Sequence, residues 1–168
     1  MMKKLLKIWP QVLIIFLVSM KIQWAVAFFW VIVHEAVHLV ISHKLKLRKE
    51  KFGIYTLGAY LKLKDLDYLT PNQDILLSLS GPMSNLFFAI ILWFFSKEFN
   101  LELLKLSYES NIVLMIANLL PAFPLDGARV LRALLSKKVL YKRACKIVVN
   151  CSFVVSLMLF CSFIFLLF

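Results

Sequence analysis

Acidic residues, glycine and cysteine are scarce in this 168-residue sequence, which has nine acids against 20 lysines and arginines, four glycines and three cysteines. The cysteines form no Cys-x-x-Cys pair, which argues against a cysteine-ligated metal site, and we interpret them as inert small hydrophobic side chains. Hydrophobic residues make up 62% of the chain, whereas soluble domains are about 45–50% apolar. The composition therefore predicts an integral membrane protein.

The excess of cations gives a formal net charge of +11, which in a soluble protein would suggest nucleic-acid binding. Here the cations lie between apolar segments, where they are typical of topology signals in membrane proteins. We therefore expect no nucleic-acid partner. A basic N-terminus precedes the first apolar run, but no small-x-small cleavage site follows, so we interpret this run as an uncleaved segment.

Apolar segments recur along the chain and predict an all-α integral membrane protein with about five transmembrane helices. The segments are 5–20, 24–42, 75–95, 112–123 and 147–168. The first is short for a full crossing, so it could be a complete span or a partly inserted one. No internal repeat or linker divides the chain, which predicts a single domain over residues 1–168.

Three further elements are expected between the spans. Residues 51–63 mix aromatic and β-branched residues with two glycines, which favours a short β-hairpin at the membrane surface. Residues 96–109 are expected to form a polar loop. Residues 128–138 predict an amphipathic helix lying flat in the interface, with basic residues on the side opposite its leucines. These basic residues are Arg129, Arg132, Lys137 and Lys138.

The basic residues also predict an orientation. Seven lie in the 43–67 connection and seven in 129–146, whereas the 96–109 connection has two. Because basic connections stay inside, the pattern predicts a multi-pass cell-membrane protein with a cytoplasmic N-terminus.

The second apolar segment contains His34, Glu35 and His38. Histidines four residues apart share one helix face and can bind one zinc ion, while the neighbouring carboxylate can move a proton from an attacking water to a leaving amine. An ionisable side chain at the centre of a membrane helix costs roughly 2.5–3.5 kcal/mol, so three on one turn require a function. The alternative is a pair of core histidines bonded to neighbouring helices, with Glu35 neutralised by a basic residue.

Two later motifs lie at comparable depth. Gly81-Pro82 and Asn85 interrupt the third apolar segment, where a proline frees a carbonyl that lipid cannot satisfy, and this predicts either a helix kink or a site lining. A catalytic zinc usually has three protein ligands. Of the nine acids, Asp126 alone is expected on the same face at a similar depth. Its alternative role is the N-cap of the helix that follows.

Together these residues resemble the three signatures of the site-2 intramembrane metalloproteases, over about residues 24–138. The closest likeness is to the stage IV sporulation protein FB branch. The signatures are His34-Glu35-Ala36-Val37-His38, Gly81-Pro82 with Asn85, and the run from Asn118 through Pro121 and Pro124 to Asp126-Gly127. The resemblance implies Zn²⁺ held by His34, His38 and Asp126, with Glu35 as the general base. A substrate-binding role is implied for Asn118, and we add Asn85, Gly81 and Pro82 to that set.

The function implied is an intramembrane zinc endopeptidase that cleaves a membrane-associated regulatory precursor, such as a sporulation pro-sigma factor, near the cytoplasmic face. The hairpin at 51–63 would align the substrate as an added strand. The partners implied are a membrane-tethered protein substrate, the lipid bilayer and a membrane regulator or inhibitor protein. One alternative is a catalytically silent membrane scaffold. Another is a metal-ion transporter, although transport sites usually draw ligands from several spans.

Overall fold

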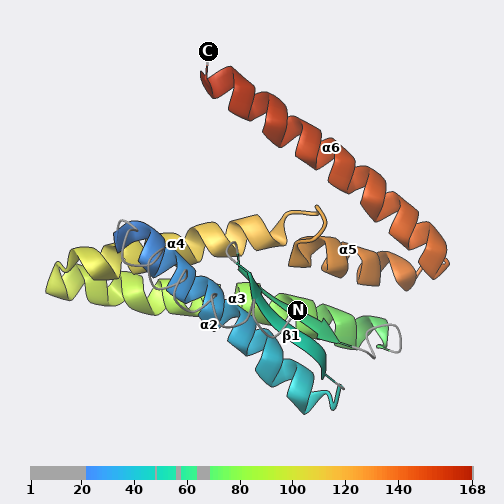
Figure 1. The fold of residues 1–168 in the computed structure, drawn as a ribbon, viewed down its shortest axis with the longest axis horizontal. Coiled ribbons are helices and arrows are strands. Elements are labelled where there is room, and N and C mark those ends of the chain that lie inside the picture. The colour runs from blue at the N-terminus through green and yellow to red at the C-terminus, as the bar shows by residue number, and fades with distance from the viewer. Residues whose placement is uncertain (1–21, 48, 56–57, 64–68, 168) are drawn as a thin grey trace, which may run out of the picture.

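The computed structural model describes residues 22–47, 49–55, 58–63 and 69–167, which form five helices and one pair of strands (Figure 1). Three helices are long and apolar enough to cross a membrane, which supports a multi-pass membrane protein. They are α2 (Ile22–Lys44), α3 (Pro71–Phe99) and α6 (Tyr141–Leu167), the last over Tyr141–Phe165. The apolar segment 5–20 lies outside the described residues, and the five-span arrangement and its orientation stay predictions.

Helix α3 is the central element of the fold. Its N-terminus is fixed by a capping box between Thr70 and Gln73, with Pro71 at the first helical position. It packs against α2, α4 (Glu102–Leu119) and α5 (Asp126–Ser136). Leu77, Pro82 and Asn85 are among the largest fully buried side chains, so the core lies along one face of α3. Pro82 is inside the helix, which continues through it.

The predicted polar loop at 96–109 is wrong. Helix α3 continues to Phe99 and α4 begins at Glu102. No glycine or proline lies between residues 96 and 109, so the charged residues extend two helices rather than a loop. The chain reverses at Asn100, whose φ of 42° is in the left-handed region that asparagine tolerates well.

The fourth apolar segment, 112–123, belongs to α4, which is not among the three helices that are long and apolar enough to cross a membrane. Only the first part of this segment is helical, because α4 ends at Leu119, before Pro121 and Pro124. A tight turn follows, with hydrogen bonds from Ala122 N to Leu120 O and from Leu125 N to Ala122 O. The turn places α5 directly against the end of α4, since a Cβ added at Gly127 would collide with the Leu119 carbonyl.

Helix α5 covers residues 126–136, so both of its ends lie two residues earlier than in the predicted amphipathic helix, 128–138. Its basic side does not simply face water as predicted. Arg129 and Arg132 are mostly buried and bind Asp74 of α3, because this buried carboxylate requires a cationic partner. Leu134, by contrast, is exposed.

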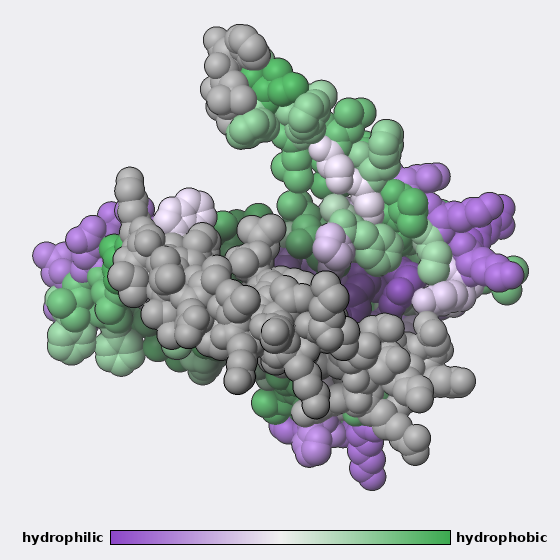
Figure 2. All heavy atoms as spheres, viewed as in Figure 1, coloured by the Kyte–Doolittle hydropathy of each residue, from purple (hydrophilic) through white to green (hydrophobic). Residues whose placement is uncertain are grey.

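Helix α6 projects away from the other helices after its first turns (Figure 1). Ala144 and Val148 are fully buried, and the side chains from Phe153 to Phe165 are largely exposed. Figure 2 shows hydrophilic residues around α5 and the start of α6, and a mostly hydrophobic surface along the rest of α6.

Strands β1 (Lys49–Tyr55) and β2 (Gly58–Leu63) form an antiparallel pair in the range where the sequence predicts a hairpin. The register pairs Phe52 with Leu61 and Tyr55 with Gly58, with an irregularity between Lys49 and Lys51. The pair packs against α2 through β2. Its place at a membrane surface stays a prediction.

Candidate metal centre

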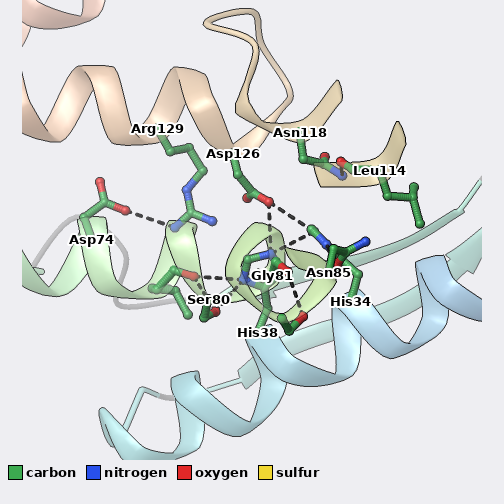
Figure 3. A network of polar contacts seen from close by, with 12 residues as sticks. His34, His38, Asp74, Ser80, Gly81, Asn85, Leu114, Asn118, Asp126 and Arg129 are labelled. Atoms are coloured by element: carbon green, nitrogen blue, oxygen red, sulfur yellow. Dashed lines mark hydrogen bonds and ion pairs between the residues drawn. The ribbon is translucent and has the colours of Figure 1, made fainter. Parts of the chain in front are cut away.

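Three ligand atoms from two distant helices converge in the core (Figure 3). His34 Nε2 lies 3.1 Å from His38 Nε2, and the Asp126 Oδ2 atom lies 3.1 Å and 3.0 Å from these two nitrogens. All three residues are buried. In tetrahedral zinc sites with bonds of about 2.0–2.1 Å, ligand atoms are separated by roughly 3.3 Å. The described residues thus place two nitrogens and one oxygen at a spacing that suits one zinc ion.

The local sequence explains how these ligands reach the core. The buried residues of α2 recur every fourth position, as Val26, Trp30, His34, His38 and Ser42, so both histidines lie on the face that packs inward. Asp126 is the first residue of α5, and the N-cap is Leu125, which has no side-chain cap bond. The alternative of Asp126 as the N-cap is therefore wrong, and its carboxylate points to the histidines instead.

The other nitrogen of each imidazole is held by α3. His38 Nδ1 lies 2.8 Å from the Leu77 carbonyl and 3.0 Å from Ser80 Oγ, and His34 Nδ1 lies 2.9 Å from Asn85 Oδ1. A carbonyl oxygen can only accept, so we assign the proton of His38 to Nδ1, and the Asn85 oxygen implies the same for His34. Both Nε2 atoms then present lone pairs to each other and to Asp126, an arrangement that a cation stabilises.

Space at the site is kept free by Gly81. A Cβ added there would lie 2.6 Å from His34 Nε2 and closer still to His38 Nε2. Any side chain at this position would occupy the region that the ligand atoms face. The donor set and this free space both fit a small cation such as Zn²⁺.

The Asp126 carboxyl is ionised in these surroundings. Burial alone would raise its pKa, but hydrogen bonds from the His34 and His38 imidazoles, when these carry a proton on Nε2, outweigh burial and lower the pKa to about 2. An ionised carboxylate is the form that binds a metal ion.

Glu35 is half-buried and follows His34 on α2. It interacts electrostatically with both histidines, Asp126 and Arg129, but it is not among the three residues whose ligand atoms converge. Its carboxylate is thus beside the cluster without being part of it.

The predicted substrate-binding residues separate into two groups. Gly81 lies against the histidines, and Asn85 holds His34 through Oδ1 while its buried Nδ2 has no partner among the described residues. Pro82 is buried in α3, next to Gly81. Asn118, in the last turn of α4, is half-buried, and its Nδ2 donates to the Leu114 carbonyl of its own helix.

Other contacts around the site were not predicted. They are the Leu77 carbonyl, Ser80, and the ion pairs of Asp74 with Arg129 and Arg132. A signal for them exists in the sequence, because Asp74, Ser78, Gly81 and Asn85 recur at helical spacing within an otherwise apolar run.

Comparisons with known proteins agree with this geometry. The chain matches the model of Peptidase family M50 over residues 24–101 and 97–159. It is 32% identical over 138 residues to the zinc metalloprotease MJ0392 of Methanocaldococcus jannaschii, covering 77% of this chain and 40% of that protein. It is 21% identical over 139 residues to the stage IV sporulation protein FB of Bacillus subtilis, covering 82% and 48%.

A solved structure is also similar. The site-2 protease from Methanocaldococcus jannaschii matches with a TM-score of 0.66 and 30% identity, covering 80% of this chain and 63% of that one. The archaeal metalloprotease is more similar to this chain than the sporulation protein is. The expected likeness to the site-2 protease family is therefore confirmed, whereas a position nearest the sporulation branch is not supported.

Proposed function

Since the chain belongs to Peptidase family M50, with a buried His34–His38–Asp126 group that fits its zinc ion, we propose that it is an intramembrane zinc endopeptidase of the site-2 type. The chain spans about 40% and 48% of the length of the curated relatives it matches. The single observation that carries the proposal is the convergence of three atoms that could bind a metal, with the Glu35 carboxylate near them but outside this group.

The residues divide the chemistry between them. His34, His38 and Asp126 would hold the zinc ion, which would polarise a peptide carbonyl and make water more acidic. Glu35 accepts the proton of the attacking water and delivers it to the leaving amine. This role is proposed for Glu35 because it follows His34 on α2 and interacts electrostatically with both histidines. The Leu77 carbonyl and Asn85 keep the imidazoles in the metal-binding tautomer.

The substrate must present an extended peptide, because a helix hides its carbonyls in its own hydrogen bonds. The strand pair β1–β2 offers a backbone edge on which such a segment could be added. In this proposal Asn118, at the end of α4, releases the Leu114 carbonyl to which it donates and donates instead to the substrate or its oxyanion. The other residues proposed to contact the substrate are Gly81, Pro82 and Asn85, which are buried close together on α3.

The substrate proposed is a membrane-tethered regulatory protein, cut near the cytoplasmic end of its span. The basic connections that predict a cytoplasmic N-terminus place the ligand-bearing ends of the helices on that side. A sporulation pro-sigma factor is one such precursor, and the 21% identity to the sporulation protein is the observation that favours it. A membrane regulator or inhibitor protein remains an expected partner.

The two alternative functions have less support. A silent scaffold would not need the three converging ligand residues together with the nearby Glu35 carboxylate. A transporter needs ligands that can be exposed alternately on both sides, whereas the described ligands come from α2 and α5 and are fixed by one face of α3.

The test is cleavage of tagged single-span reporters co-expressed with the protein. Reporters with helix-breaking residues near the cytoplasmic end should be cut faster than reporters with an uninterrupted leucine span. Glu35→Gln should abolish cleavage while the protein keeps its zinc. Cleavage that persists in Glu35→Gln, or that maps to the opposite end of the span, would contradict the proposal.

A further inference from the structure

The Asp74 carboxylate of α3 forms ion pairs with two arginines of α5, Arg129 and Arg132. Its Oδ1 lies 3.0 Å from Arg129 Nη2, and its Oδ2 lies 2.8 Å from Arg132 Nη2. The Asp74 side chain is 9% exposed, and the two arginine side chains are 22% and 17% exposed. Figure 3 shows Arg129 reaching from α5 to Asp74. Three charges removed from solvent need a structural reason, because each is costly to bury alone.

The ion pair is on the side of α5 that carries the metal ligand. Arg129 and Arg132 follow Asp126 by three and six residues, so all three side chains lie toward one side of this 11-residue helix. Two contacts one turn apart fix the rotation of a short helix about its axis. The direction in which Asp126 leaves the helix is then fixed as well.

One face of α3 supports all three ligands. Asp74, Leu77, Gly81 and Asn85 are separated by three, four and four residues, which is the spacing of a single helix face. Leu77 and Asn85 hold the two histidines. Within the described part of the chain, the hydrogen bonds of the Asp126 side chain go to His34 and His38, so its support comes through the helix rather than through a direct contact.

We propose that Asp74 is the positioning residue for Asp126 and acts on it through Arg129 and Arg132. The inference rests on Asp126 being a zinc ligand. Residues that orient metal ligands typically change metal affinity by about 10–100-fold when they are removed. Asp74 would then affect zinc binding without touching the metal.

The experiment measures zinc affinity by chelator competition on the purified full chain, with Asp74→Asn made in two backgrounds. In the wild-type background the affinity should fall about 10–100-fold. In the Asp126→Ala background the same change should leave the residual affinity of His34 and His38 unaltered. Asp74→Glu keeps the charge and should restore most of the affinity. Lys137→Gln removes an exposed cation from the C-terminal end of α5 and is the matched control.

Two readouts separate positioning from general stability. The visible spectrum of the Co²⁺-loaded protein should change in Asp74→Asn, because the ligand geometry changes. If Asp74→Asn does not fold, Arg132→Gln is measured in the same two backgrounds with the same expectation. Equal loss of affinity with and without Asp126, or no loss at all, would overturn the proposal. Full zinc affinity in Asp126→Ala alone would overturn the ligand assignment on which it rests.

Discussion

Helices α3 and α6 are both long and apolar enough to cross a membrane, yet they differ in how much of their surface packs against the rest of the protein. In the most apolar window of α3, 33% of the residues are buried in the protein, against 6% for α6. The polar residues on the inner face of α3 hold side chains of α2 and α5. In α6, Ser152 is the polar residue that contacts the turn before Asp126.

The difference shows what a polar residue in an apolar helix indicates here. A buried polar group costs free energy unless it is hydrogen-bonded, so a face with several such groups needs partners that are fixed in place. For Asp74, Ser80 and the Asn85 oxygen on α3, those partners are the metal ligands or the helix that carries one. The exposed apolar side chains of α6 need only lipid, and they should tolerate exchange. Substitutions on the two helices should therefore differ sharply in their effect on zinc.

The largest effect is expected at Gly81. In Gly81→Ala the new methyl group enters the space faced by both Nε2 atoms, so stoichiometric zinc should be lost. Metal analysis of the purified protein checks this. Met83→Ala, at an exposed position on the same helix, should keep its zinc. Zinc retained at wild-type affinity in Gly81→Ala would mean that the ion lies elsewhere.

Asn85 should come next. Asn85→Ala frees the His34 ring from its Nδ1 partner, and zinc affinity should fall about 10–100-fold. Asn111→Ala is the matched control, because Asn111 is equally buried but bonds only to the Ser107 carbonyl within α4 among the described contacts. That control should lower the Tm and leave zinc affinity unchanged. Similar zinc affinities in the two variants would contradict the claim that Asn85 of α3 supports a metal ligand and Asn111 of α4 does not.

A smaller effect is expected from Ser152, whose hydroxyl accepts the Phe123 N–H at 3.0 Å. Ser152→Ala leaves this backbone donor unsatisfied, which costs about 1–3 kcal/mol of stability. Phe123 lies three residues before Asp126, so zinc affinity should also fall severalfold. Thermal unfolding and chelator competition measure the two effects. Ser162→Ala, at an exposed position on α6, should change neither, and an equal effect there would refute the anchoring role.

The smallest effect is expected at the exposed end of α6. Phe160 and Phe163 are both 61% exposed, and changing either to Leu should alter stability by less than about 0.5 kcal/mol. Zinc affinity should stay at the wild-type value. A large loss of zinc in either variant would mean that the end of α6 contacts the site.

The metal ligands could be predicted from the sequence because their signals are local. His34 and His38 are four residues apart, and Asp126 stands beside a helix break marked by two prolines. The long apolar runs likewise located both ends of α2 and α3 to within four residues, whereas α6 begins six residues before the predicted segment. These features depend only on the spacing of residues within one segment, and this spacing can be read directly from a single sequence.

Contacts between segments could not be predicted in the same way. Asp74 is separated from Arg129 and Arg132 by 55 and 58 residues, and their meeting depends on how α3 and α5 are rotated. The same holds for Asn85, which the sequence placed in the substrate site and the structure places against His34. The prediction of a loop at 96–109 was wrong for another reason. It relied on polar composition, although no glycine or proline in this region breaks a helix.

The central claim is that His34, His38 and Asp126 bind one zinc ion while Glu35 serves only the chemistry. Zinc per protein chain, measured on purified wild type, Glu35→Gln and Asp126→Ala, tests it most directly. The account predicts one zinc in the wild type and in Glu35→Gln, and a large loss in Asp126→Ala. Full zinc in Asp126→Ala, or loss of zinc in Glu35→Gln, would contradict it.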